Sequence, residues 1–281
     1  MNYKIKRILY YMPKKMITKI RYFYVTGKKL DLKDPKDFNE KVLYLMLNEC
    51  DDKKKQCVDK YLAREYVKEK GLTDILVNLY GKYDNANDID FNKLPDEYVL
   101  KTNHGCGCTI IKTKNQVLNE NNIIKELNNS LKINYAKQTL EYQYENIKPC
   151  IICEEYLKES KKKMPNDYKI FCFNGKAKFL LACEGRDSEI KKVYYDMYWQ
   201  KLECTKEKQG FEIIKPKNFD DMIKIAEKLA EDFKFVRVDL YNINGKIYFG
   251  ELTFTPRGGI NNTIKQEYLD KWGDFIDIKR G

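Results

Sequence analysis

The sequence predicts an α+β protein in which helices and antiparallel hairpins follow one another along the chain. Two stretches, 167–185 and 235–254, place β-branched and aromatic residues on both sides of an Asn-Gly pair, which is a strong hairpin signal. Elsewhere, apolar residues recur at the spacing of helices that pack with one face on a core. This mixed order of elements is typical of the α+β class.

Composition indicates a globular chain without a membrane span. The 281 residues are 43% hydrophobic and 13% aromatic, enough for one sizeable core or two modest ones. No apolar run approaches the ~20 residues needed to cross a bilayer, and no stretch resembles a cleaved signal peptide, so we expect a cytoplasmic protein. The nine cysteines, an odd number scattered among Lys-rich segments, indicate reduced thiols rather than disulfides.

The excess of basic over acidic residues indicates which kinds of binding partner to expect. The chain has 53 basic and 42 acidic residues, and the formal net charge of +11 favours polyanions or an anionic surface. Basic and aromatic residues are spread through predicted helices and strands and form no nucleic-acid recognition motif, so we expect no nucleic-acid partner.

Residues 1–30 form a basic segment without a single acidic residue. Its apolar residues recur at near-helical spacing, and Pro13 is expected to break or kink the helix. This composition suits a helix lying on anionic lipid, at the inner face of the membrane. The alternative is a helix packed on its own domain with a solvated basic side. The apolar residues are Ile5, Leu9, Met12, Met16, Ile20 and Phe23.

Three further helices are predicted from apolar residues in helical phase. They cover residues 53–70, where a glycine follows as an end signal, residues 120–147 and residues 220–233. In the first of them Lys60 and Arg64 are four residues apart, so both would lie on one face. The third leads into the second hairpin.

A strand, a glycine-rich loop and another strand are predicted within residues 96–114, DEYVLKTNHGCGCTIIKTK. Lys101 ends the first strand, and Gly105 and Gly107 leave the loop backbone free to approach a ligand. Backbone N–H groups and an ammonium group both suit anionic oxygen, so this loop is a candidate phosphate site. The alternative is that the glycines only form a turn.

Two more strand segments carry charged side chains. A short buried strand ends in the acidic pair Glu154-Glu155. In the first hairpin, Asp167 and Lys169 lie on one face because strand side chains repeat every two residues.

The turn of the second hairpin decides which of its residues share a face. With a two-residue turn at 244–245, Asp239 and Glu251 would point to opposite faces. With a three-residue turn at 243–245, Asp239 would lie opposite Phe249 and the two carboxylates would share a face. We predict the three-residue turn, because it separates a polar from an apolar face. The polar face is Arg237, Asp239, Glu251 and Thr253, and the apolar face is Val236, Val238, Leu240, Tyr248, Leu252 and Phe254.

Carboxylates that converge from two strands suit Mg²⁺, which usually takes one or two carboxylates and completes its shell with water and nucleotide phosphates. The alternative is structural: Arg237 would form an ion pair with either acid on a solvated face. The hairpin alone does not decide between the two.

Five ordered blocks together resemble the ATP-grasp enzymes and, more closely, their TupA-like branch, which is associated with teichuronopeptide and capsular polysaccharide biosynthesis. The blocks are DKYLAREYV, LPDEYVLKTNHGCG, IICEEYL, DYKIFCFNGK and FVRVDLYNINGKIYFGELTFTP. The resemblance covers most of the chain and implies an ATP-grasp fold, with two α+β subdomains that hold ATP between them. The expected division is a basic segment at 1–30, an N-terminal subdomain at 31–95, a small ATP-grasp subdomain at 96–156 and a large one at 157–281.

The resemblance also implies roles for residues of the nucleotide site. Lys101 matches a lysine that contacts the nucleotide phosphates, and Arg64 matches an upstream basic residue with the same task. Gly105 and Gly107 belong to the flexible glycine loop that matches the family's. The hinge, where backbone groups read the adenine edge, matches Glu154, Glu155, Tyr156 and Leu157.

The remaining matches concern the metal and the reacting groups. Asp239 and Glu251 match the carboxylates that hold Mg²⁺, and Thr253 stands where the wider superfamily usually has Asn. A Thr hydroxyl can still ligate a metal or bind a metal-bound water. Lys169 matches a phosphate or substrate ligand, and Arg237 a group that contacts the transferred phosphate or the acyl phosphate.

The implied activity is that of an ATP-dependent carboxylate–amine ligase that works through an acyl phosphate, with ATP and Mg²⁺ as cofactors. Its substrate would be a small molecule or a lipid-linked glycan, with an amino acid or amine attached to a sugar acid of a surface polysaccharide. An ATP-grasp kinase acting on a small amide or sugar is the alternative.

A non-catalytic module that binds glycan or zinc is a further alternative. His104, Cys106 and Cys108 with Cys150 and Cys153 have zinc-like spacing, but three-residue spacing in a strand puts Cys150 and Cys153 on opposite faces. His104 is a general base, a phosphorylation site or a loop residue with local hydrogen bonds, and we expect the last of these.

Overall fold

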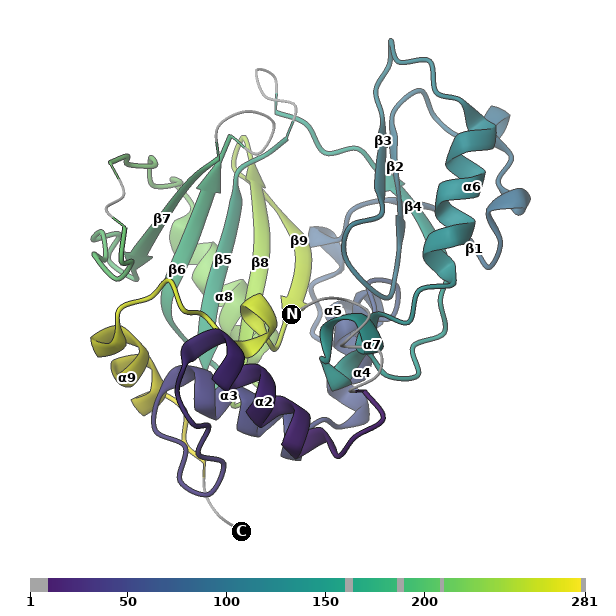
Figure 1. The fold of residues 1–281 in the computed structure, drawn as a ribbon. Coiled ribbons are helices and arrows are strands. Elements are labelled where there is room, and N and C mark those ends of the chain that lie inside the picture. The colour runs from purple at the N-terminus through teal and green to yellow at the C-terminus, as the bar shows by residue number, and fades with distance from the viewer. Residues whose placement is uncertain (1–9, 160–163, 186–189, 208–209, 279–281) are drawn as a thin grey trace.

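The structure, a computed structural model, describes residues 10–159, 164–185, 190–207 and 210–278. Two antiparallel sheets stand side by side, and helices pack around them (Figure 1). The predicted α+β class is therefore confirmed. All nine cysteines are free thiols, as expected.

The large sheet has five strands in the order β7-β6-β5-β8-β9. Both predicted Asn-Gly turns are present, with positive φ at Asn174, Gly175, Asn244 and Gly245. This conformation is the one that two-residue hairpins favour. The strands are β5 (Asp167–Phe173), β6 (Lys176–Glu184), β7 (Lys191–Asp196), β8 (Phe235–Ile243) and β9 (Lys246–Thr253).

Helices cover both faces of the large sheet. On one face, α8 (Phe219–Ala230) packs through residues such as Met222 and Leu229. On the other, α3 (Phe38–Asn48) and α9 (Gln266–Asp274) enclose an aromatic cluster in which Trp272 stacks on Phe179 at 4.0 Å between ring centroids. Farther along this second face the side chains become polar, and there the site is built.

The small sheet has four strands in the order β1-β4-β2-β3. α6 (Glu120–Leu131) packs on one face, with Leu127 in a core shared with Leu100 and Cys153. The alternate residues Val99 and Lys101 face the large sheet. The strands are β1 (Leu79–Tyr83), β2 (Tyr98–Thr102), β3 (Thr109–Lys112) and β4 (Ile151–Glu155), so this sheet begins before residue 96, within the stretch expected to belong to the preceding subdomain.

Two predicted helices are interrupted. Residues 53–70 form α4 (Asp52–Val58) and α5 (Ala63–Glu69) instead of one helix. Asp59 ends α4, because its carboxylate accepts the backbone N–H groups of Tyr61 and Leu62 at 2.8 and 3.2 Å. Such local side-chain bonds compete with the helical ladder.

Residues 120–147 likewise break, after α6, into a short α7 (Tyr135–Thr139) and a 3₁₀ turn at Tyr142–Tyr144. Asn134 caps α7, and Leu140 ends it with a φ of 62°. The predicted helix at 220–233 is present as α8, although it ends at Ala230.

The β8–β9 hairpin has a different turn from the predicted one. Ile243 pairs directly with Lys246, so the turn has two residues and the predicted three-residue turn is wrong. Phe249 consequently lies opposite Leu240 and is buried, whereas Tyr248, which was expected in the core, is only half buried.

A β-bulge at Gly250 nevertheless brings Asp239 opposite Glu251. The bulge inserts one extra residue into β9 and shifts its side-chain phase. The shift gives the polar face that was predicted, since Arg237, Glu251 and Thr253 are in hydrogen-bond contact. A Cβ at Gly250 would lie 2.9 Å from the carbonyl oxygen of Asp239, so this close approach requires glycine.

The basic N-terminal segment contains α2 (Lys14–Thr26), which begins directly after Pro13. Its inner side buries Ile17, Thr18, Arg21 and Tyr22. The part of the segment at residues 1–9, with Ile5 and Leu9, lies outside the described residues. Among the helices that are described, none combines the length and apolar character needed to cross a membrane.

Candidate functional site

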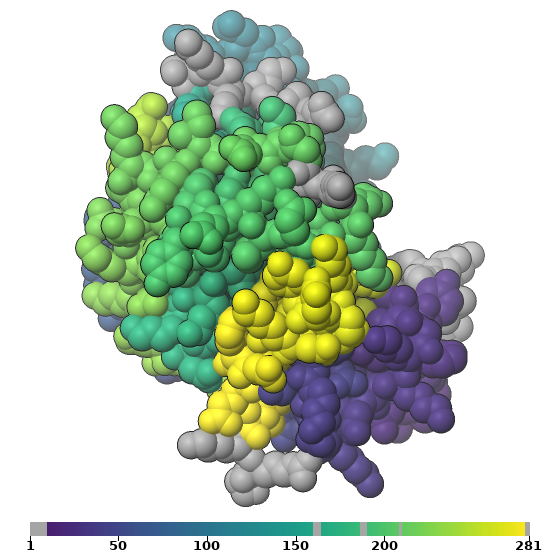
Figure 2. Space-filling view, turned by 90° about the vertical axis from the view of Figure 1, so that its left-hand side faces the viewer, coloured from purple at the N-terminus to yellow at the C-terminus, as the bar shows by residue number. Residues whose placement is uncertain are grey.

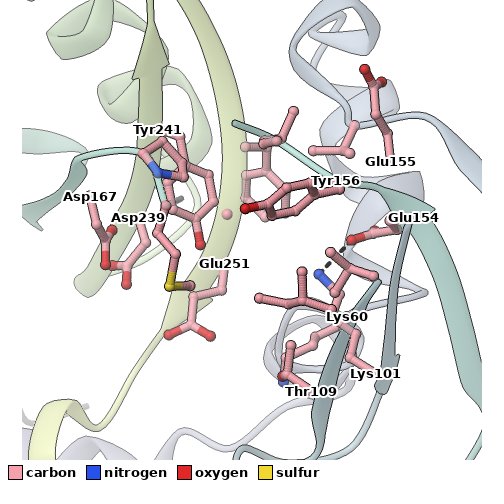
Figure 3. Close-up of a pocket in the computed structure, with 18 of the residues that line it drawn as sticks. Lys60, Lys101, Thr109, Glu154, Glu155, Tyr156, Asp167, Asp239, Tyr241 and Glu251 are labelled. Carbon is pink, nitrogen blue, oxygen red and sulfur yellow. Dashed lines mark ion pairs between the residues drawn. The ribbon is translucent and has the colours of Figure 1, made fainter. Parts of the chain in front are cut away.

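A cavity of 380 Å³ lies between the two sheets. This volume is within the range of about 300 to 1,000 Å³ that is typical of small-molecule sites. Lys60, Lys101 and Glu154 face Asp239 and Glu251 across it (Figure 3). Of the predicted site residues, all but Arg237 and Thr253 line the cavity.

On the small-sheet side, Lys101 and Arg64 share one carboxylate. Lys101 Nζ lies 2.5 Å from Glu154 Oε2, and Arg64 Nη1 lies 3.2 Å from Glu154 Oε1. Arg64 also donates to the carbonyl oxygen of Val77 at 2.8 Å. Because β2 and β4 are adjacent, their side chains on this face converge. Glu154 therefore balances two cations that an incoming phosphate would also attract.

Lys60 is a third cation of the cavity, and sequence reasoning gave it no role. It lies in the turn between α4 and α5, where its backbone N–H donates to Asn103 O at 3.0 Å and its ammonium donates to Gly105 O. Burial lowers the pKa of Lys60, although the negative charge of Glu251 acts in the opposite direction. The four-residue spacing of Lys60 from Arg64 indicated that the two side chains share a face. The predicted continuous helix, however, did not include the turn that directs Lys60 into the cavity.

The glycine loop between β2 and β3 closes one end of the cavity, and its geometry requires both glycines. Gly107 has a φ of 103°, which side-chain-bearing residues rarely adopt. A Cβ at Gly105 would lie 2.7 Å from the ring of Tyr135 in α7. Cys106 lies between them, with its Sγ 2.9 Å from the Tyr135 hydroxyl.

The predicted hinge, residues 154–157, begins in the last two residues of β4 and continues past the end of the strand. Glu154 and Glu155 use their backbones in sheet pairing, and the Glu155 N–H donates to Asn78 O at 2.9 Å. Tyr156 and Leu157 follow the strand and line the cavity next to Val99. The backbone past residue 155 takes no part in the pairing of β4 with β2.

On the large-sheet side, Arg237 joins both carboxylates. It donates to Asp239 at 2.6 and 2.7 Å and to Glu251 at 3.1 Å. The Thr253 hydroxyl donates to the same Glu251 oxygen at 2.9 Å. The structural alternative, an ion pair with Arg237, is therefore present. The face is not an ordinary solvated one, because Asp239 is 4% exposed while Glu251 remains 42% exposed to the cavity.

Lys169 completes this side from β5. Its ammonium lies 2.5 Å from Asp239 Oδ2 and 2.6 Å from Asp167 Oδ2, which confirms that Asp167 and Lys169 share a face. β5 pairs with β8, and the register places Lys169 directly opposite Asp239. Positive and negative groups thus alternate at contact distance across this face of the sheet, from β5 through β8 to β9.

Burial and neighbouring charges oppose one another in this cluster. Burial would raise the pKa of Glu251, but the charges of Arg237, Lys60 and Lys169 outweigh it and hold that pKa at about 2. Burial raises the pKa of Asp239, although Arg237 and Lys169 act in the opposite direction. Glu251 is thus the firmly ionised, accessible carboxylate of the pair.

The donor set suits a hard cation. Asp239, Glu251 and Thr253 offer two carboxylates and a hydroxyl, and the exposed edge of Glu251 leaves room for water and phosphate ligands. No cluster of three or more His, Cys, Asp or Glu side chains poised to hold a metal occurs in the described part of the chain. Two carboxylates alone fit Mg²⁺, which binds proteins through few side chains.

The cysteine and histidine pattern has local explanations. Cys150 and Cys153 are both buried, and burial raises the pKa of each thiol. His104 is buried outside the cavity lining, with its Nε2 3.0 Å from Ile133 O. Burial lowers the pKa of His104. The geometry therefore supports the loop residue with local bonds rather than the general base.

The family model for TupA-like ATP-grasp proteins matches residues 40–277. The chain belongs to this family. The match includes every predicted site residue and both sheets, and it leaves out the whole basic N-terminal segment. A search of curated proteins finds no match.

Solved structures agree with this family at the level of the fold. The L-amino acid ligase from Bacillus licheniformis is 11% identical with a TM-score of 0.51, over 87% of this chain and 55% of that one. The D-alanine–D-alanine ligase from Bacillus anthracis, in complex with ATP, is 16% identical with a TM-score of 0.46, over 86% and 66%. This TupA-like chain thus spans two thirds or less of these ligases. Its ATP-grasp fold is shown by the family match together with the likeness to the L-amino acid ligase.

Proposed function

We propose that this protein is an ATP-dependent carboxylate–amine ligase that works through an acyl phosphate. The observation that carries the proposal is that Lys60 and Lys101 lie across one cavity from the carboxylates Asp239 and Glu251 (Figure 3). Arg64 lies on the side of the lysines, where it shares Glu154 with Lys101. Cations on one side suit the phosphates of ATP, and carboxylates on the other suit the metal that accompanies them.

The chain's own residues would position the nucleotide. Lys101 and Arg64 would leave the Glu154 carboxylate and bind phosphate oxygens instead. The backbone N–H groups of the glycine loop would donate to the same phosphates. Val99 and Ile111 offer apolar contact for a base, next to the backbone at Leu157. Nucleotide binding would thus use both the face of the small sheet and the segment after β4.

At the large sheet, Asp239, Glu251 and Thr253 would hold Mg²⁺, which when bound supplies charge neutralisation for the transferred phosphoryl group. Arg237 and Lys169 are held beside it by their ion pairs with Asp239. Their charges favour the negative charge that develops on the equatorial oxygens. Phosphoryl transfer depends mainly on such positioning and charge.

The reaction balances as two displacements. A substrate carboxylate oxygen forms a bond to the γ-phosphorus while the bond to ADP breaks. An amine then attacks the acyl carbon, phosphate leaves, and the amine loses a proton to solvent. Membership of the TupA-like family supports a sugar acid or amino acid of a cell-surface polysaccharide as the substrate, and the positive net charge suits such acidic polymers.

The first test is thermal unfolding with Mg-ATP, Mg-ADP and other nucleotides. Ligand at 100 times its dissociation constant stabilises a protein by about 2.7 kcal/mol, which is readily detected. The shift should vanish in Lys101→Met and persist in the control Lys125→Met, an exposed lysine on α6. No adenine-selective shift in the wild type would refute the nucleotide site.

The second test identifies products when uronic acids and amines are supplied with ATP. A ligase forms an amide and releases ADP and phosphate, whereas a kinase leaves the phosphate on its acceptor. Asp239→Asn should abolish Mg-dependent turnover while the fold is retained. A phosphorylated acceptor without amide would replace the ligase proposal by the kinase alternative.

A further inference from the structure

The outward side of α2 is apolar, although a helix at the surface of a domain usually turns polar residues to solvent. Met16, Ile20, Phe23 and Tyr24 form this side, which we call the outer face of α2. Their exposed fractions are 41, 41, 58 and 66%. The spacing of i, i+4, i+7 and i+8 puts all four on one continuous stripe.

The opposite side of α2 fixes this orientation. Ile17 and Tyr22 are buried, and Tyr22 belongs to a core with Leu43 of α3. Arg21 is also buried and donates to the carbonyl oxygen of Gly258. The outer face of α2 is therefore held away from the protein by packing on its other side and cannot rotate inward without breaking these contacts.

Positive charge borders the outer face of α2. Lys15 and Lys19 are exposed and lie one helical turn apart beside the apolar stripe, and α2 contains no acidic residue. Within the described ranges, neither lysine takes part in an ion pair. An exposed apolar stripe next to lysines that form no ion pair is the pattern of a helix that lies in a lipid interface.

We propose that the outer face of α2 docks this protein on an anionic membrane surface. The apolar side chains would enter the boundary between headgroups and acyl chains, and Lys15 and Lys19 would meet lipid phosphates. Lipid is favoured over a protein partner because the stripe is bordered by like charges, and the three main cavities of the described residues contain no residue of α2. α2 lies on the outside of the molecule, next to α3 (Figure 1).

Docking would also place the end of β9 that carries Glu251 and Thr253 near the lipid, and its consequence for the substrate rests on the proposed function. β9 carries Glu251 and Thr253 and runs directly into the turn at Pro256–Gly259, where Arg21 binds Gly258. A helix with side chains is about 10 Å across. One helix diameter would thus separate this turn from the bilayer, within reach of a lipid-linked substrate.

The experiment is co-sedimentation of the full chain with vesicles of phosphatidylcholine alone or mixed with phosphatidylglycerol. The test variant is Ile20→Glu/Phe23→Glu. The control is Tyr198→Glu/Ile214→Glu, which makes the same change at two exposed apolar residues far from α2 in the chain. Thermal unfolding of each variant shows whether the fold is retained, and the shift of its Tm with Mg-ATP shows whether the nucleotide site is retained. A failure of membrane binding is thus distinguishable from a failure of the ligase proposal.

We expect the wild type and the control to bind anionic vesicles and the test variant to lose binding. Lys15→Gln/Lys19→Gln should weaken binding about thirtyfold, since each lysine near an anionic surface contributes ~1 kcal/mol. The proposal is overturned if the wild type ignores anionic vesicles, or if the control loses as much binding as the test variant. It is also overturned if the wild type is a dimer that Ile20→Glu/Phe23→Glu dissociates, because the stripe would then be a protein interface.

Discussion

Glu154→Gln separates the structural role of Glu154 from the nucleotide-binding role of its two partners. In the structure, the Glu154 carboxylate holds Lys101 at 2.5 Å and Arg64 at 3.2 Å, and it is 9% exposed. Glutamine keeps the size of the side chain but removes its charge. Both cations then lack a counter-ion until a phosphate arrives.

The expected loss of stability follows from this geometry. Removing one partner of a buried ion pair costs about 3 to 5 kcal/mol. Here Lys101 is 22% exposed and Arg64 keeps its bond to Val77 O, so water and that carbonyl offset part of the loss. We expect about 2 kcal/mol, or a fall in Tm of roughly 3 to 4 °C for a chain of this size.

Binding of Mg-ATP should restore the stability that Glu154→Gln loses. In the wild type a phosphate must displace Glu154 from the two cations, whereas in Glu154→Gln it meets them unneutralised. The Mg-ATP stabilisation, measured by thermal unfolding, should therefore be at least as large in Glu154→Gln as in wild type, and abolished in Lys101→Met. Glu126→Gln, on the exposed side of α6, serves as the control. If Glu154→Gln loses Mg-ATP binding as completely as Lys101→Met, Glu154 contacts the nucleotide itself and our reasoning is wrong.

Other predictions concern the bulge and the third cation. Gly250→Ala should lower the free energy of unfolding by about 1 to 3 kcal/mol, because its methyl group would crowd the Asp239 carbonyl. Urea denaturation measures this change in stability. An unchanged denaturation midpoint would argue against the close approach of the two backbones. Lys60→Met should weaken Mg-ATP binding in calorimetry. Since burial lowers the pKa of Lys60, wild-type affinity should fall as pH rises from neutral into the alkaline range, and this step should be absent in Lys60→Met. A step of equal size in the variant would assign the titration to another group.

The sequence was informative where spacing alone determines geometry. The Asn-Gly turns, the strand–loop–strand around Lys101 and the pairing of Asp167 with Lys169 all follow from local turn chemistry and the two-residue strand period. Most of the predicted site therefore gathers in one cavity. The order of the five blocks identified the family, which the match over residues 40–277 confirms.

Local rules failed where a long-range contact decides the structure. Asp59 turns the chain between α4 and α5, and Asn103 fixes that turn by binding Asp59 at 2.8 Å across 44 residues of sequence. The role of Lys60 depends on this turn and was missed. In the second hairpin, the two-residue turn alone would put Asp239 and Glu251 on opposite faces, and the bulge at Gly250 brings them back to one face. The predicted polar face was therefore right although the predicted register was wrong.

The aromatic cluster on the large sheet has a spectroscopic consequence. The chain has two tryptophans, Trp199 and Trp272. Trp272 lies in the cluster, and Trp199 stacks on Tyr195 of β7 at 4.5 Å between ring centroids. Intrinsic tryptophan emission of this protein therefore reports on the body around the large sheet (Figures 1 and 2). A loosening of the small sheet alone would leave that emission unchanged and would be detected by amide hydrogen exchange at β2 and β4.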